Sequence, residues 1–239
     1  MAIDFDAASS EYLDALTEFA DLRGNNALGE ASFSFWIKTT QISGSSNDWQ
    51  SPHVTGYENV GNNDCMWGGI DNGGASASKM WQSWAQGTNW NLKSVTPIND
   101  DVWHHIVQTV KLAGSIGQVF VDGVLDNSRS GGTSTVPANT FTEIGRLTGA
   151  TSYYFDGLLD DVRIYNRVLG ANEVAAMYAQ RGADPNFEGC VSRWRIDEGA
   201  PGVVVAGAGV VKDDIGGNNC TPSATPTFEE SVVGARRVA

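Results

Sequence analysis

Short runs of alternating hydrophobic and polar residues recur along the chain, and each predicts a β-strand with two distinct faces. The clearest run spans residues 31–41. Its inward positions are Phe33, Phe35 and Ile37, and its outward positions are Ser34, Trp36 and Lys38. We therefore expect a strand whose phenylalanine face packs into a hydrophobic core.

A second strand pattern, Phe-Asp-Gly-Leu-Leu-Asp-Asp-Val-Arg-Ile-Tyr, spans residues 155–165. At period two, one face holds Leu158, Asp160, Val162 and Ile164. That face is apolar apart from Asp160. A carboxylate in a buried row is costly unless an arginine, several backbone N–H groups or a metal ion pairs with it. Ca²⁺ suits a carboxylate beside a turn, because it takes oxygen ligands and accepts backbone carbonyls readily.

A short amphipathic helix is predicted directly after this strand. Glu173 follows Gly170 by three residues, which is the spacing of a capping box with glycine at the cap. One face carries residues spaced i, i+3 and i+4, namely Val174, Met177 and Tyr178. Gly182 suits the end of the helix. We therefore expect one short helix near residues 170–181.

The stretch from residue 155 to residue 178 resembles the closing pattern F-x-G-x-I-D-E-V-R-I-Y-N-R-x-L-S-x-x-E-I-x-x-L-Y of the concanavalin A-like, laminin G-like jelly-roll domains, a group related to the pentraxins. Other stretches resemble strands of this family in the same order, at residues 2–6, 31–41, 101–126 and 141–146. The resemblance covers residues 1–181 and implies an all-β fold, a two-sheet antiparallel jelly-roll β-sandwich. It leaves the function open, because this fold hosts lectins, adhesins, enzymes and structural modules.

The C-terminal region resembles a segment that normally stands at the other end of such a domain. After a linker at residues 182–189, residues 190–239 are similar to the W-x-F-D-E-G and D-x-S-G-N-G lead-in of the family. The chain would read continuously if Ala239 were joined to Met1. This β extension completes either the sandwich of its own chain, as in a circular permutant, or that of a neighbouring subunit. A flexible extension is the third alternative.

The resemblance also implies a place for a metal ion. In the family, the opening and closing strands often lie side by side, and calcium is commonly held between them. Carried over to this chain, that places Asp6 near Asp160 as ligands of a structural Ca²⁺ ion. The alternative is a pair of capped or hydrogen-bonded aspartates without a metal.

Residues 43–95 concentrate aromatic and polar side chains, including five of the eight tryptophans. Indole faces stack on sugar rings, and loops carry function more often than strands do. The candidate ligand-binding residues are Trp49, Tyr57, Trp67, Trp81, Trp84 and Trp90. Three interpretations remain open for them, namely glycan binding, a protein interface and plain core packing.

The chain is acidic, with a formal net charge of −13 over 239 residues. Because it contains no basic cluster, we expect neither a nucleic acid nor an anionic membrane surface as its partner. No apolar segment approaches 18 residues, so membrane insertion is not expected. No signal peptide pattern follows Met1, so a location on a virion surface or outside a cell implies either that the chain has been trimmed or that it leaves the cell by another route.

Three cysteines leave two redox states open. In one, Cys190 and Cys220 form a disulfide and Cys65 stays free. In the other, all three are reduced.

No catalytic motif stands out in the sequence. It lacks the Glu-x-Asp-x-x-Glu strand of jelly-roll glycoside hydrolases, the Gly-x-Ser-x-Gly elbow, zinc-ligand spacings and a P-loop. His104 and His105 are adjacent, so they point to opposite faces of a strand and cannot chelate one ion. We therefore predict that the protein is not an enzyme, with a glycoside hydrolase as the remote alternative.

Two non-catalytic functions are consistent with these features. The first is an oligomeric structural protein, a surface-decorating or adhesion subunit such as that of a phage virion. It would contact its own copies or another surface protein through residues 186–239. The second is a calcium-dependent, lectin-like carbohydrate-binding module that uses the loops of residues 43–95.

Overall fold

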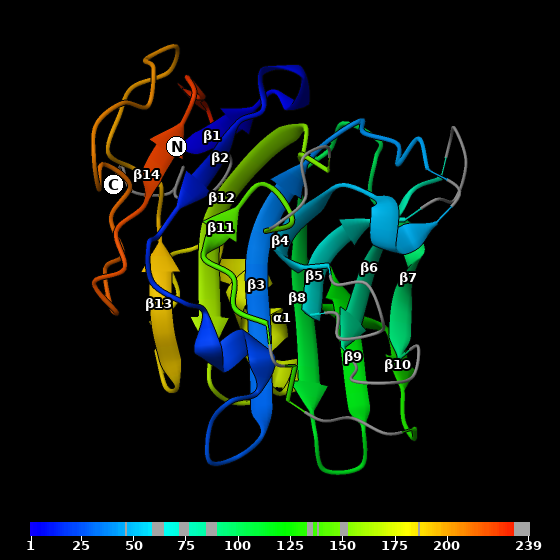
Figure 1. Ribbon diagram of the computed structural model, residues 1–239. Helices are drawn as coiled ribbons and strands as arrows, with labels where there is room; N and C mark the ends of the chain where they lie inside the picture. Colours follow the sequence, from blue (N-terminus) through cyan, green and yellow to red (C-terminus); the bar gives the residue numbers. More distant parts are fainter. Residues whose placement is uncertain are drawn as a thin grey trace.

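Two antiparallel layers of strands pack face to face in the computed structural model of this chain (Figure 1). The structure describes residues 1–45, 47–58, 65–71, 77–84, 90–132, 136–137, 139–148, 153–185 and 187–231. The all-β, two-sheet antiparallel architecture predicted from the sequence is confirmed. Residues 186 and 232–239, which belong to the predicted partner-binding region, lie outside the described residues.

The larger layer is an eight-stranded antiparallel sheet. In spatial order its strands are β10 (Val124–Arg129), β9 (Ile116–Val121), β8 (His104–Lys111), β3 (Glu30–Lys38), β12 (Gly157–Tyr165), β1 (Ala2–Phe5) and β15 (Thr227–Glu229). Strand β13 (Cys190–Trp194) pairs with the second half of β12, beyond the part that pairs with β1. The opening and closing strands therefore lie side by side, as the resemblance implied.

The smaller layer consists of two sheets that meet edge to edge. One contains β4 (His53–Tyr57), β5 (Cys65–Ile70), β6 (Lys79–Trp84) and β7 (Asn91–Pro97), and the other contains β11 (Glu143–Ile144), β2 (Tyr12–Asp14) and β14 (Thr221–Ser223). Thr55 Oγ1 donates to Glu143 O at 2.6 Å, and Gly145 N donates to Val54 O at 2.6 Å. Three 3₁₀ turns span Ala7–Ser9, Ala20–Arg23 and Asp48–Gln50.

The core lies between the two layers and is rich in aromatic rings. Phe33, Phe35 and Ile37 of β3 are fully buried in it, which confirms the inward face predicted for this strand. The Phe33 and Phe35 ring centroids are 4.9 Å apart. Strand β3 is central in its sheet and anchors β8 and β12 on either side.

The predicted helix is present as α1 (Ala171–Gln180), behind the larger sheet in Figure 1. Glu173 Oε2 accepts from Gly170 N at 2.8 Å. Because glycine has no side chain to return a hydrogen bond, this is half of a capping box. The helix ends at Arg181 in the left-handed conformation, with φ of 45°, one residue before the predicted Gly182.

The C-terminal extension completes the sandwich of its own chain in this structure. Strand β13 pairs with β12, β14 pairs with β2, and β15 pairs with β1. The extension also adds apolar side chains to the main core, namely Trp194, Ile196, Val205, Val211, Cys220 and Phe228. The extension is therefore an integral part of the fold.

The three cysteines Cys65, Cys190 and Cys220 are buried free thiols, so the structure contains the reduced form rather than the Cys190–Cys220 disulfide. Burial raises the pKa of the Cys190 thiol to about 11, which makes it a poor nucleophile at neutral pH. None of the helices in the described ranges has the length and hydrophobicity needed to cross a membrane.

Candidate functional site

Strand β12 contains a β-bulge that changes which side chains face the core. Its register with β3 pairs Asp160 with Trp36 and then Arg163 with Ser34, so β12 has one residue more than its partner here. Asp161 lies at the bulge and adopts a left-handed conformation, with φ of 44°. An extra residue of this kind shifts the alternation of every side chain beyond it.

Because of the bulge, the side chains of β12 alternate between the two faces of the sheet differently from the prediction. The core face holds Leu159, Val162 and Ile164. Asp160 lies on the opposite, outer face, which helix α1 covers in part. A strict period-two pattern placed Asp160 within the apolar row because the pattern cannot register an inserted residue.

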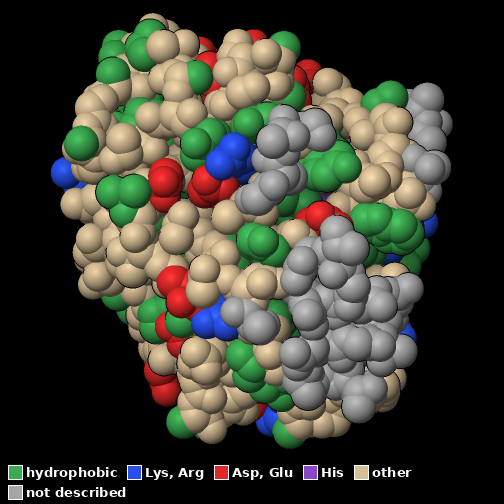
Figure 2. All heavy atoms as spheres, viewed as in Figure 1, with side chains coloured by type: hydrophobic (Ala, Val, Ile, Leu, Met, Phe, Trp, Pro, Cys, Tyr) green, Lys and Arg blue, Asp and Glu red, His purple; other side chains and the backbone are tan. Residues whose placement is uncertain are grey.

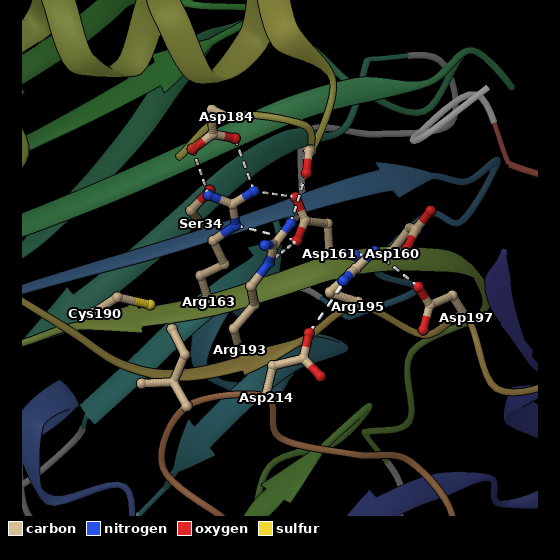
Figure 3. Close-up of polar contacts among 12 residues, drawn as sticks. Ser34, Asp160, Asp161, Arg163, Asp184, Cys190, Arg193, Arg195, Asp197 and Asp214 are labelled. Atoms are coloured by element: carbon tan, nitrogen blue, oxygen red, sulfur yellow. Dashed lines mark hydrogen bonds and ion pairs between the residues drawn. The ribbon is translucent and has the colours of Figure 1, made fainter. Parts of the chain in front are cut away.

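A buried network of four charged side chains follows the bulge on the outer face (Figure 3). Arg163 donates to both carboxylate oxygens of Asp184, at 2.7 and 2.8 Å. Asp161 Oδ1 accepts from Arg163 Nε at 3.1 Å and from Arg193 Nε at 2.8 Å. All four residues are at most 5% exposed. Two arginines thus balance two aspartates, and the network joins β12, β13 and the segment after α1.

The side chains of this network are held in their charged forms. Burial alone would raise the pKa of the Asp161 carboxyl, but Arg163 and Arg193 outweigh it and hold that pKa below its ordinary value. Burial opposes the charged form of Arg163, yet Asp161 and Asp184 raise its pKa well above the ordinary value. Groups this strongly paired do not exchange protons near neutral pH, so we assign the network a structural role.

The two adjacent histidines of β8 have separate partners, in agreement with their predicted opposite orientation. His105 is buried, which lowers its pKa to about 4, and its Nε2 lies 3.0 Å from Ser34 Oγ. His104 lies between two carboxylates, with Nδ1 2.8 Å from Asp122 Oδ2 and Nε2 3.1 Å from Asp100 Oδ1. These hydrogen bonds raise the pKa of His104.

The predicted calcium ligands Asp6 and Asp160 do not share a site. The register of β1 with β12 pairs Phe5 with Gly157, which sets Asp6 beside Asp156 and four strand positions from Asp160. At roughly 3.3 Å per residue, the two backbones are about 13 Å apart. Oxygen ligands lie about 2.4 Å from a Ca²⁺ ion, so these two aspartates do not fit a shared ion and that prediction is corrected.

Each of these aspartates has partners of its own. Asp6 caps the turn Ala7–Ser9, because its Oδ1 accepts from Ala8 N at 2.8 Å and its Oδ2 from Ser9 Oγ at 2.7 Å. Asp160 is buried, which raises its pKa well above the ordinary value, and its Oδ1 accepts from Asp161 N at 2.7 Å. Across the described ranges, no three His, Cys, Asp or Glu side chains are arranged to hold a metal ion.

Most of the tryptophans predicted to bind a ligand are core residues. Trp67, Trp81, Trp84 and Trp90 are at most 2% exposed. Three of them belong to the main core, and Trp81 packs with Met66 and Leu147 in a smaller cluster. Because an indole buried to this degree offers no face for stacking on a ligand, the prediction is wrong for these four residues.

The other two candidates are more accessible. Trp49 is 44% exposed in the turn Asp48–Gln50, and Tyr57 is half-buried at the end of β4. Figure 2 views the molecule from the side of β4, β5 and β6, where the described hydrophobic side chains are scattered among polar groups. The Asp48 carboxylate beside Trp49 pairs with Lys93 Nζ at 2.9 Å. Trp49 therefore offers one exposed indole beside the Asp48–Lys93 ion pair.

An aromatic cleft lies instead on the outer face of the larger sheet, beside α1. This cleft has a volume of about 390 Å³ and is lined by Trp36, Lys38, Asp101, Val102, Trp103, Tyr178 and Arg181. The Trp36 and Tyr178 rings are stacked, with centroids 5.7 Å apart and planes at 20°. Trp36 is 3% exposed and forms the floor, whereas Trp103 and Tyr178 are half-buried. The cleft combines ring surface with three charged side chains.

An exposed ion pair stands at the mouth of the aromatic cleft. Lys38 Nζ lies 3.3 Å from Asp101 Oδ1, and the two side chains are 31% and 65% exposed. Asp101 is held at φ of 63°, a region that non-glycine residues seldom occupy, although aspartate tolerates it. A pair this exposed adds little to stability. Unusual backbone geometry without a stability benefit is often found at functional sites.

A second cleft shares Lys38 and Asp101 but has a different character. It has a volume of about 430 Å³, and its lining includes the carboxylates of Asp4, Asp156, Glu229 and Glu230. Burial, together with repulsion from Glu229 and Asp156, raises the pKa of Asp4. The Lys38–Asp101 pair therefore separates an aromatic cleft from an acidic one.

The sequence patterns included the aromatic residues of the cleft, but they did not predict that these residues lie together in the fold. Trp36 fell on the outward face of its strand, and Trp103 preceded the strand of the two histidines. Tyr178 belonged to the predicted face of the helix. Nothing in these local patterns states that α1 crosses the sheet beside β3, which is what brings the three rings together.

Comparison with protein families matches residues 12–175 to a family described as the concanavalin A-like lectin/glucanases superfamily. No curated protein matches the chain. Among solved structures, a candidate carbohydrate binding protein from Bacteroides ovatus superposes with a TM-score of 0.63 at 17% identity, over 96% of this chain and 60% of that one. The present chain thus spans 60% of the length of that protein.

Two further solved structures share the fold at comparable distance. The heptameric SAP-like pentraxin from Limulus polyphemus has a TM-score of 0.52 at 14% identity, over 77% of this chain and 84% of that one. The CBM40 of the Ruminococcus gnavus IT-sialidase has a TM-score of 0.52 at 14% identity, over 74% of this chain and 96% of that one. Identities this low establish a shared fold only.

Proposed function

Because this chain belongs to the concanavalin A-like lectin/glucanases superfamily, we propose that it is a non-catalytic carbohydrate-binding module. The observation that carries the proposal is the aromatic cleft of Trp36, Trp103 and Tyr178 beside helix α1. Binding there replaces the predicted use of residues 43–95, whose tryptophans are mostly buried. The proposal does not require calcium.

The dimensions and chemistry of the cleft suit a saccharide. Ligand sites usually measure about 300 to 1,000 Å³ and combine apolar walls with a few polar groups. Here ring surface from Trp103 and Tyr178 can cover the C–H face of a sugar. Lys38, Asp101 and Arg181 supply donors and acceptors for its hydroxyl groups. The names of two proteins of the same fold, the Bacteroides ovatus protein and the CBM40, support a carbohydrate as the ligand class.

The cleft lining supports binding without hydrolysis. Glycoside hydrolysis generally uses two carboxyl groups that flank the scissile bond. Among the described residues that line the aromatic cleft, Asp101 is the one carboxylate. It pairs with Lys38 at 3.3 Å, an arrangement that suits hydrogen bonding to a ligand hydroxyl.

The test is retention on a panel of immobilised glycans, followed by calorimetric titration of those that bind. We expect Trp103→Ala to weaken binding about tenfold or more, because anchor aromatics dominate binding energies. Its melting temperature should stay close to that of the wild type, since Trp103 is half-buried at the end of a loop. Trp49→Ala is the matched control, because it removes an exposed indole that does not line the aromatic cleft.

Two results would contradict the proposal. If Trp49→Ala abolished retention and Trp103→Ala left it intact, the site would lie near the turn Asp48–Gln50. If no glycan were retained by the wild type, carbohydrate binding itself would be rejected.

A second candidate function is assembly on a surface, as an oligomeric adhesion or decorating subunit of a virion or another extracellular structure. The observation that favours it is the attachment of β13, β14 and β15, each of which pairs with a strand from the first 165 residues. Strands attached in this way can exchange between copies and build closed assemblies. Light-scattering mass at micromolar concentration tests this function, and a monomer would count against it.

A further inference from the structure

Arg181 is an exception among the arginines of this protein. Its side chain is exposed and lines the aromatic cleft, just after the last residue of α1. Within the described part of the chain, its guanidinium has no ion pair and no hydrogen bond. The guanidinium groups of the other described arginines each have a hydrogen-bond or ion-pair partner, at positions 23, 129, 146, 163, 167, 193 and 195.

The helix dipole explains why a basic residue stands at the end of α1, but it does not explain why Arg181 lines the aromatic cleft. A cation near the C-terminus of a helix is stabilised by the helix dipole. That effect accounts for a basic residue at the end of α1, but any direction into solvent would satisfy it. It does not account for a guanidinium placed at the edge of a cleft walled by Trp103 and Tyr178.

The charge of the aromatic cleft is positive, opposite in sign to the net charge of the protein. The protein has a formal net charge of −13, yet this cleft is lined by two cations, Lys38 and Arg181, and a single carboxylate, Asp101. Since Lys38 is paired with Asp101, the guanidinium of Arg181 is the charge left for a ligand. The acidic cleft next to it and two further clefts, lined by Glu173 with Asp184 and by Glu18 with Asp21, are acidic instead.

We propose that the aromatic cleft binds an acidic saccharide, with Arg181 pairing with the carboxylate of the sugar and the rings of Trp103 and Tyr178 covering its face. This inference rests on the proposed function and names the ligand class of the same site. A guanidinium matches a carboxylate with two parallel N–H···O bonds, which fixes both the position and the orientation of the sugar. Uronic and sialic acids carry this group directly on the ring.

A single arginine favours a carboxylate sugar over a highly sulfated polymer. Binding of a polyanion draws on many lysines and arginines along its backbone. The aromatic cleft offers one free guanidinium, and the acidic cleft on the other side of the Lys38–Asp101 pair would repel the next sulfate groups of a polymer. The ligand we infer is therefore a short or terminal acidic sugar.

The experiment compares ligands that differ in one group. Lactose, lactose with a terminal sialic acid and lactose with a sulfate ester are titrated into the full chain, together with neutral and uronic-acid oligosaccharides of one length. We expect the carboxylated ligands to bind about tenfold or more tightly than their neutral counterparts, and this preference to shrink as salt is added. Arg181→Gln should remove the preference, and Arg181→Lys should restore part of it.

Arg129→Gln is the control with the same change in net charge, because Arg129 is a surface arginine on β10 that packs over Trp90. It should keep the full preference for carboxylated ligands. Equal binding of neutral and acidic sugars by the wild type would overturn the inference and leave the proposed function standing. A preference for the sulfate ester over the carboxylate, or an equal loss in the Arg129 variant, would also overturn it. Failure of every saccharide to bind would reject the proposed function as well.

Discussion

Arg193 on strand β13 donates from Nε to Asp161 Oδ1 on strand β12 at 2.8 Å, with both side chains buried. This contact ties the C-terminal extension to the bulge of the sandwich. Because Asp161 also binds Arg163, which in turn binds Asp184, one hydrogen-bonded network fastens three separate segments of the chain. The stability of the fold should therefore respond strongly to changes in this network.

Replacement of Arg193 by alanine is expected to lower the free energy of unfolding by about 3 to 5 kcal/mol, because it leaves a buried carboxylate without one of its partners. Arg195→Ala is the matched control, two residues further along the chain. Arg195 pairs with Asp197 at 3.1 Å in a partly exposed position, so its loss should cost about 1 kcal/mol or less. Denaturant unfolding measures both changes. Equal effects of the two substitutions would show that the network is not a special source of stability.

A chain that ends at Asp184 is expected to aggregate or unfold. The missing segment supplies Trp194 and Phe228 to the main core and the strands that pair with β1, β2 and β12. Their loss would leave apolar surface open to water and two sheet edges unpaired. Light-scattering mass and circular dichroism measure the outcome. A soluble, monomeric and cooperatively folded product would show that the extension is dispensable.

The two buried histidines are expected to make the folded state less stable as the pH falls from about 6.5 to about 4. Burial lowers the pKa of both His53 and His105 to about 4, so in this range the unfolded chain binds protons that the folded chain does not. The contribution of these two histidines to stability therefore rises with pH across this window and is lost on acidification, whereas the raised pKa of Asp160 acts in the opposite direction. Each histidine contributes about 2 kcal/mol between pH 7 and pH 5.

Resonances of the two imidazole rings, followed by NMR during a pH titration of the folded protein, check this directly. They should stay in the neutral form until the pH approaches 4. Titration of either ring near pH 6.5 in the folded state would show that its burial is not maintained in solution. His104 serves as an internal reference, because its two carboxylate partners raise its pKa.

Removal of calcium is expected to leave the melting temperature unchanged. The predicted ligand Asp6 lies beside Asp156, four residues before Asp160, and each of the two predicted ligands has its own hydrogen-bond partners. An ion that bound the folded state would raise the melting temperature in proportion to its occupancy. Thermal unfolding in EDTA and in millimolar CaCl₂ makes the comparison. A clear rise in calcium that Asp6→Asn abolishes would restore the predicted site.

Local patterns in the sequence were sufficient for the broad architecture. The alternation of Phe33, Phe35 and Ile37 marks a core strand in any sandwich, because side chains of a strand point alternately to two faces. The spacing from Gly170 to Tyr178 likewise indicates a helix before any tertiary contact is known, and α1 spans Ala171–Gln180. The long match of the closing strand and helix to one family then gave the fold.

Contacts between distant segments decided the rest. The bulge at Asp161 exists because β12 pairs with β3 on both sides of an inserted residue, with the register shifted by one across it. The sequence of one strand does not show how many residues its partner places opposite it. Trp67 of β5 and Trp84 of β6 are buried because the opposite layer covers them, whereas Trp103 is accessible in the loop just before β8. Arg181 meets the rings of the aromatic cleft because α1 lies across β3. Composition and periodicity describe which side chains are available, but burial and the grouping of charges follow from which surfaces the folded chain brings together.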